Sequence, residues 1–174
     1  MLQLQTVTGY GPLAAGTATL PITVCMLLLA SRGGRFSARA GPRIPLTFGP
    51  IVMGLGTAWL LTVDADARYV TTVLPGLTVF GLGLSLTVAV SGATVLAAAP
   101  EEHAGLASGV SNAVARAGSL LAVAALPPLV GLSGDQYADP VALDAAYTPA
   151  ILVCSGLLML GGAISWVLIP AHVP

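Results

Sequence analysis

The sequence predicts an all-α fold, a polytopic membrane helix bundle with about five transmembrane helices. Of its 174 residues, 56% are hydrophobic and 7% are charged, whereas a water-soluble domain carries about 25% charged residues. The apolar residues form runs of about 20, the length that crosses a bilayer. Runs such as 22–30 do not alternate apolar and polar residues, as the strands of a membrane barrel do. This composition and the net charge of −1 exclude a disordered chain and a basic nucleic-acid-binding protein.

The first two predicted spans are 13–31 and 45–63. A turn at 9–12, with two glycines and a proline, precedes the first span. Residues 1–8 lack the charged leader and the cleavage site of a signal peptide, so we expect them to be the end of a preceding helix. Pro45 suits the first position of the second helix, because proline has no N–H to leave unpaired there.

The remaining predicted spans are 73–97, 104–129 and 147–169, with Pro149 in the first turn of the last. The connections are short, so residues 1–174 are expected to form one partial C-terminal transmembrane bundle. Helices in lipid associate by close packing, so we expect the glycines of the spans where backbones meet. These glycines are Gly54, Gly56, Gly76, Gly81, Gly83, Gly161 and Gly162. The prolines that predict helix bends are Pro21, Pro50 and Pro75.

The placement of arginines predicts the orientation of the bundle. Four of the six arginines lie in the connection 32–44, and positively charged short loops stay in the cytoplasm. The connection 98–103 and the tail 170–174 then also lie inside, while 64–72 and 130–146 lie outside. We therefore expect a multi-pass protein of the inner (plasma) membrane with a cytoplasmic C-terminus.

The most informative motif lies in the connection between the first two spans. Gly34 and Gly41 bracket Arg35 and Arg39, and Arg43 follows. Glycine permits a tight connection, and guanidinium groups can bond the last carbonyls of helices or acidic side chains. Two interpretations stay open. Either Arg39 and Arg43 hold the cytoplasmic ends of the first two helices, so that Arg39→Ala would lower transport, or the arginines only set the topology.

This motif resembles the cytoplasmic loop signature of the major facilitator superfamily. Gly34, Arg39, Gly41 and Arg43 match the signature, and Ala38 departs from it. The family has an acidic residue or Asn at the position of Ala38, where it anchors a charge network that gates the cytoplasmic side.

Two further segments resemble the fourteen-helix drug:proton antiporter branch of that superfamily (QacA/EmrB type). One is 4–21, which contains Gln5 and the turn at 9–12, and the other is 100–118, which contains the run Ala-Gly-Leu-Ala-Ser-Gly. The resemblance covers the last five helices of the branch and implies a C-terminal fragment of a secondary active efflux transporter. It implies proton-coupled export of drug-like or amphipathic small molecules by alternating access. The implied partners are the lipid bilayer, protons, a small-molecule substrate, and the missing N-terminal helices of the same protein or another chain.

The predicted span 104–129 has a polar face. At about 100° per residue, its small residues form one stripe and its polar residues lie beside it. The stripe consists of Gly105, Gly109, Ala113 and Ala117, and the polar residues are Ser108, Asn112, Arg116 and Ser119. A polar face in a membrane helix must find partners or line water. Two interpretations stay open: the face lines a transport cavity together with Gln5, or Asn112 and Arg116 cap helix contacts near the cytoplasmic end.

The sequence shows no catalytic or metal-binding constellation. His103 and His172 stand beside no nucleophile, and Cys25 and Cys154 lack metal-ligand spacing. We therefore expect no enzyme, no catalytic residue, no metal and no cofactor. No Asp or Glu lies within a predicted span, so the proton-carrying group is expected in the missing part. The same absence leaves open a non-transporting membrane scaffold or accessory subunit, and a transporter of other cargo also remains an alternative.

Overall fold

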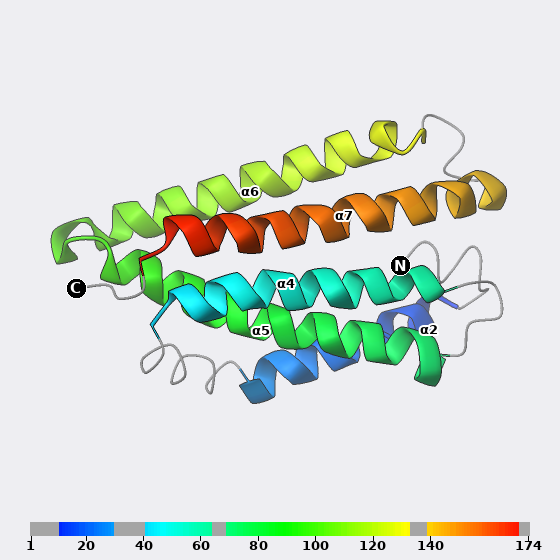
Figure 1. The fold of residues 1–174 in the computed structure, drawn as a ribbon, viewed down its shortest axis with the longest axis horizontal. Helices are drawn as coiled ribbons and strands as arrows, with labels where there is room; N and C mark the ends of the chain where they lie inside the picture. The colour runs from blue at the N-terminus through cyan, green and yellow to red at the C-terminus, as the bar shows by residue number, and fades with distance from the viewer. Residues whose placement is uncertain (1–10, 30–40, 64–68, 133–138, 171–174) are drawn as a thin grey trace.

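The structure, a computed structural model, describes residues 11–29, 41–63, 69–132 and 139–170 (Figure 1). All regular secondary structure in these ranges is helical, which confirms the all-α prediction. The helices are α2 (Pro12–Thr17), an unlabelled helix Leu20–Leu29, α4 (Arg43–Trp59), α5 (Leu74–Ala97), α6 (Ala104–Leu129) and α7 (Pro140–Leu168). Four segments are long and apolar enough to cross a membrane: Arg43–Thr62, Tyr69–Ala97, Glu101–Leu129 and Val141–Leu168.

The first predicted span, 13–31, is not one continuous helix. α2 ends at Thr17, and a new helix begins at Leu20. Pro21 explains the interruption, because its ring would clash with the carbonyl four residues earlier and it has no N–H to donate. The Thr19 hydroxyl donates to the Gly16 carbonyl at 2.8 Å and closes the intervening turn. The expected bend at Pro21 is therefore a break between two short helices.

The other two predicted bends differ from each other. Pro50 lies inside α4, as expected. Pro75 lies in the first turn of α5, directly after a π-helical turn over Tyr69–Val73. Proline is tolerated in the first helical turn, where its missing N–H would have no partner. Pro75 therefore marks the start of α5 rather than a bend within it.

α4 is the central helix and packs against both α5 and α7 (Figure 1). Its backbone comes close to both neighbours at glycines. A Cβ on Gly83 of α5 would lie 2.6 Å from the Met53 nitrogen, and a Cβ on Gly162 of α7 would lie 2.7 Å from the Thr47 carbonyl oxygen. Gly161 differs, because a Cβ there would meet nothing within 4 Å. Close backbone approach is thus confirmed at most of the predicted glycines but not at Gly161.

α7 begins earlier than the sequence predicts. The helix starts at Pro140 rather than at 147, because the Asp139 carboxylate accepts a hydrogen bond from the Val141 N–H at 2.9 Å and caps the helix. Pro149 consequently lies inside α7 and not in its first turn. Asp144 also lies within this helix, near its start and before the predicted span 147–169.

α6 stands apart from the packed helices. It follows α5 through a 3-10 turn, Glu101–His103, and among the long helices it contacts mainly α5. None of its residues is buried. The core of the described chain is therefore built by α4, α5 and α7, with Leu20–Leu29 laid against α5 where Cys25 meets Gly81.

Candidate functional site

Side-chain hydrogen bonds join α4 to α7 in the middle and at one end of their contact. The Ser155 hydroxyl donates to the Gly54 carbonyl at 2.9 Å, and Ser155 is buried. The Tyr147 hydroxyl donates to the carbonyl of Leu60, the residue that follows α4, at 3.0 Å. In an apolar surrounding such bonds resist sliding, because a displaced hydroxyl would have no water to replace its partner.

Arg43 makes the corresponding connection at the opposite end. Its Nε donates to the Trp166 carbonyl at 2.8 Å, and its Cζ lies 4.1 Å from the centre of the Trp166 ring. The bond satisfies a carbonyl in the last turn of α7, and the ring face attracts the positive charge. Gly41 has a φ of 76°, a left-handed conformation that favours glycine, and thereby directs the chain into α4. Three connections thus hold α4 and α7 along their whole contact.

Only Gly41 and Arg43 of the predicted loop signature lie within the described residues. Gly34, Arg35 and Arg39 lie outside the described residues, as does Gln5. Arg43 was expected to join the ends of the first two spans, but among the described residues it bonds α7. Sequence reasoning missed Trp166 as its partner, since nothing in the sequence pattern relates two residues 123 positions apart.

The polar residues of α6 share one exposed face. Asn112 and Arg116 are exposed, and the Asn112 amide donates to the Ser108 carbonyl one turn earlier at 3.1 Å. A Cβ on Gly105 or Gly109 would meet nothing within 4 Å. The structure therefore keeps the predicted face together and leaves it uncovered by the described part of the chain. It gives no support to the interpretation that these residues cap helix contacts within this chain.

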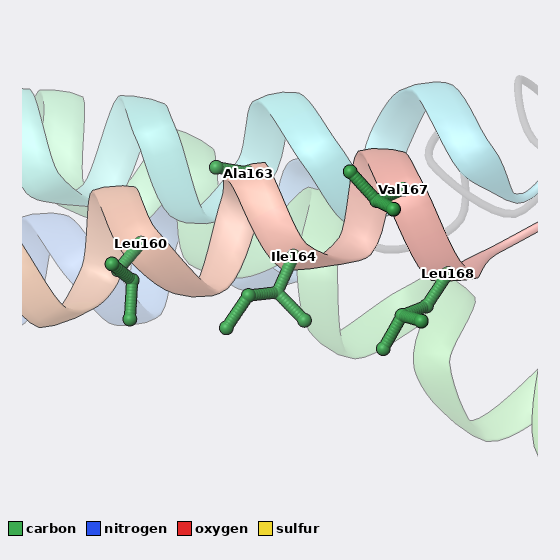
Figure 2. A pocket seen from close by; sticks show the side chains of 5 residues that line it. All are labelled: Leu160, Ala163, Ile164, Val167 and Leu168. Atoms are coloured by element: carbon green, nitrogen blue, oxygen red, sulfur yellow. The ribbon is translucent and has the colours of Figure 1, made fainter.

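The grooves found on the surface of the described residues are lined mainly by apolar side chains. Figure 2 shows one of about 430 Å³ on α7, where Leu160, Ile164 and Leu168 follow one another at a spacing of four residues. Its other lining residues are Ala163 and Val167. Such a surface suits lipid tails or another apolar helix. Among the described residues no group of three or more His, Cys, Asp and Glu could hold a metal ion, and Cys25 and Cys154 are free thiols.

Comparison with known proteins gives a consistent result, although no family model matches the chain. The multidrug resistance protein Stp of Mycobacterium tuberculosis is 32% identical over 123 residues, which cover 71% of this chain and 22% of that protein. The puromycin resistance protein pur8 of Streptomyces alboniger is 29% identical, with 97% of this chain and 36% of that protein covered. The quinolone resistance protein NorB of Staphylococcus aureus is 29% identical, with 93% of this chain and 34% of that protein covered.

The chain spans about a fifth to a third of the length of these curated relatives. The similarity runs through the helices described above, four of which are long and apolar enough to cross a membrane. The chain is a multi-pass membrane protein that is distantly homologous to part of the fourteen-helix drug efflux proteins of the major facilitator superfamily.

Proposed function

We propose that this chain is the C-terminal part of a secondary active transporter that exports drug-like or amphipathic small molecules in exchange for protons. The observation that carries the proposal is the similarity to resistance proteins, which extends over 97% of the chain for pur8 and 93% for NorB. The relatives' names mention resistance to puromycin and quinolone, which are drug-like small molecules.

The packing supports a role as a rigid portion of a rocking transporter. Alternating access moves one helix bundle against another around a central site. Glycine contacts and three side-chain bonds unite α4 and α7. α6 adds a polar face that these helices do not cover. We propose that this face is directed toward the remainder of the transporter.

We also propose that α4 begins and α7 ends at the cytoplasmic surface. Arg43 and Trp166 meet at this end of the bundle. Tryptophan is enriched at membrane interfaces, and arginines favour the cytoplasmic side. The orientation agrees with the cluster of arginines that precedes α4 in the sequence.

A non-transporting scaffold is the alternative. Its support is the absence of acidic residues from the predicted spans, since Asp144 lies near the start of α7 and before the predicted span. The similarity to resistance proteins favours the transporter.

A chimera tests the proposal. In pur8, this chain would replace the segment that it matches, and the chimera would be expressed in a puromycin-sensitive bacterium. We expect puromycin resistance that a protonophore abolishes, and no resistance from this chain expressed alone. The controls are intact pur8 and pur8 without the segment, and membrane insertion is measured for each.

A chimera that inserts normally but confers neither resistance nor proton-dependent efflux of a lipophilic dye would contradict the transport proposal and favour the scaffold. Resistance from the chain alone would contradict the view that it is one part of a larger transporter.

A further inference from the structure

Of the two arginines that the structure describes, one has partners for its charged group and the other has none. Arg43 bonds the Trp166 carbonyl and lies over the Trp166 ring. Arg116, on α6, is exposed and has no hydrogen bond or ion pair with any described residue. An arginine on a water-soluble helix needs no partner, but α6 is apolar and long enough to cross a membrane.

Arg116 stands near the middle of the 26-residue helix α6. With a rise of about 1.5 Å per residue, it lies about 18 Å from Ala104, roughly as far as from the other end of the helix. The hydrocarbon core of a bilayer is about 30 Å thick, so the middle of a spanning helix is where a long side chain reaches the headgroups least easily. A charge at this depth needs a counter-charge or a water-filled space.

The acidic residues that the structure describes do not supply the counter-charge. Glu101 and Glu102 lie in the turn before α6, and Glu102 lies 3.7 Å from His103. Asp139 and Asp144 lie at the start of α7, which the chain reaches after the other end of α6. Glu101 and Glu102 are about four turns from Arg116 along the chain, and none of the four acidic residues forms an ion pair with it among the described residues.

The surroundings of Arg116 on α6 suit close approach by another helix. On a helical wheel, Gly105, Gly109 and Asn112 fall within about 40° of Arg116. Glycines allow two helix backbones to approach closely, and an amide can bond across the contact. A Cβ on Gly105 or Gly109 would meet nothing within 4 Å, so the described chain leaves this face open.

We propose that Arg116 forms an ion pair with a carboxylate of a membrane helix that belongs to the same transporter and lies outside this chain. The face formed by Gly105, Gly109, Asn112 and Arg116 is the surface on which that helix docks. The relatives have the length to supply such a helix, since this chain spans 22–36% of them. This inference rests on the proposed function, because a chain that acted alone would have no such helix.

The test uses two polypeptides expressed together, this chain with an affinity tag and the remainder of pur8 without its matching segment. Co-purification in a mild detergent measures docking. We expect Arg116→Gln to lower the captured amount at least tenfold and Arg116→Lys to retain most of it. Val114→Gln is the matched control, because it places the same amide at similar depth about 160° around the helix. Its capture should equal that of the unchanged chain.

Charge reversal identifies the partner. Arg116→Glu should abolish capture, and changing one intramembrane Asp or Glu of the pur8 remainder to Arg should restore it. Circular dichroism of each isolated variant verifies that the helices form, so that loss of capture cannot be ascribed to misfolding.

Several results would overturn the proposal. Unchanged capture by Arg116→Gln, or no capture by the unchanged chain, would show that Arg116 does not hold this helix. If Arg116→Gln is captured normally but no longer supports export of anionic compounds, Arg116 would instead be a cargo-binding residue. Arg116-dependent capture of a second, differently tagged copy of this chain would make the face a self-association surface. If docking occurs as expected but no export is detected, the proposed function fails and the docking surface stands.

Discussion

Ser155 is buried at the centre of the contact between α4 and α7, where its hydroxyl donates to the Gly54 carbonyl. We expect Ser155→Ala to lower the free energy of unfolding by about 0.6 kcal/mol, the average for a hydrogen bond between membrane helices. Unfolding in mixed detergent micelles, followed by circular dichroism, measures this. Ser165→Ala is the control, because the Ser165 hydroxyl bonds Gly161 of its own helix. Equal losses for both variants would contradict a special role for Ser155.

Arg43 combines a hydrogen bond with a contact to the face of Trp166, and the two can be separated. Trp166→Leu removes only the ring contact and should lower the free energy of unfolding by about 0.5–1 kcal/mol. Arg43→Gln removes the charge from both interactions, so its loss should be larger. The same unfolding measurement ranks the two variants. If Arg43→Gln unfolds like the unchanged protein, Arg43 serves only to set the topology.

Gly162 decides how closely α7 approaches α4. A Cβ there would lie 2.7 Å from the Thr47 carbonyl oxygen, so Gly162→Ala must push the helices apart. Overpacking of this kind costs about 1–3 kcal/mol. Gly161→Ala is the matched control, because its Cβ would meet nothing within 4 Å and alanine favours a helix over glycine by about 1 kcal/mol. The expected effects on unfolding are therefore opposite in sign for neighbouring residues, and equal effects would contradict this packing.

The elements show which sequence signals are reliable. α6 has the bounds that the sequence predicts, since Pro100 and the acidic turn precede it and the apolar run defines its length. α7 starts seven residues early because one carboxylate, that of Asp139, caps it. Hydropathy misses this start because the first turns of α7 contain Asp144 and read as a loop. The first span divides at Pro21 because proline has no N–H to donate and its ring clashes with the preceding turn. Hydropathy does not predict this break, because it measures only how apolar a residue is.

For the molecule as a whole, the orientation can be measured directly. In a background with Cys25→Ser and Cys154→Ser, we expect Val70→Cys and Leu132→Cys to react with an impermeant thiol reagent in intact cells. Ala99→Cys should react only after the cells are opened. The arginine-rich connection 32–44 is expected to stay in the cytoplasm, and the connection that contains residue 99 lies on the same side of the membrane. The reverse pattern would show that the bundle is inserted with the opposite orientation.

The sequence by itself determined that this chain is a set of membrane helices and where most of them lie. Hydrophobicity and length are properties of a single segment, so they can be read without knowing its neighbours. The polar face of α6 is equally local, because the helical period alone places its residues together.

Only the tertiary structure decided which helices meet. The bond from Arg43 to Trp166 joins residues 123 positions apart, and the bond from Ser155 to Gly54 joins residues 101 apart. Gly161 and Gly162 are adjacent residues of the same type, yet only Gly162 faces α4. Such pairings depend on how surfaces fit in three dimensions and not on any segment alone. For the same reason, this structure shows that Arg116 lacks a partner among the described residues, a fact that the sequence could not establish.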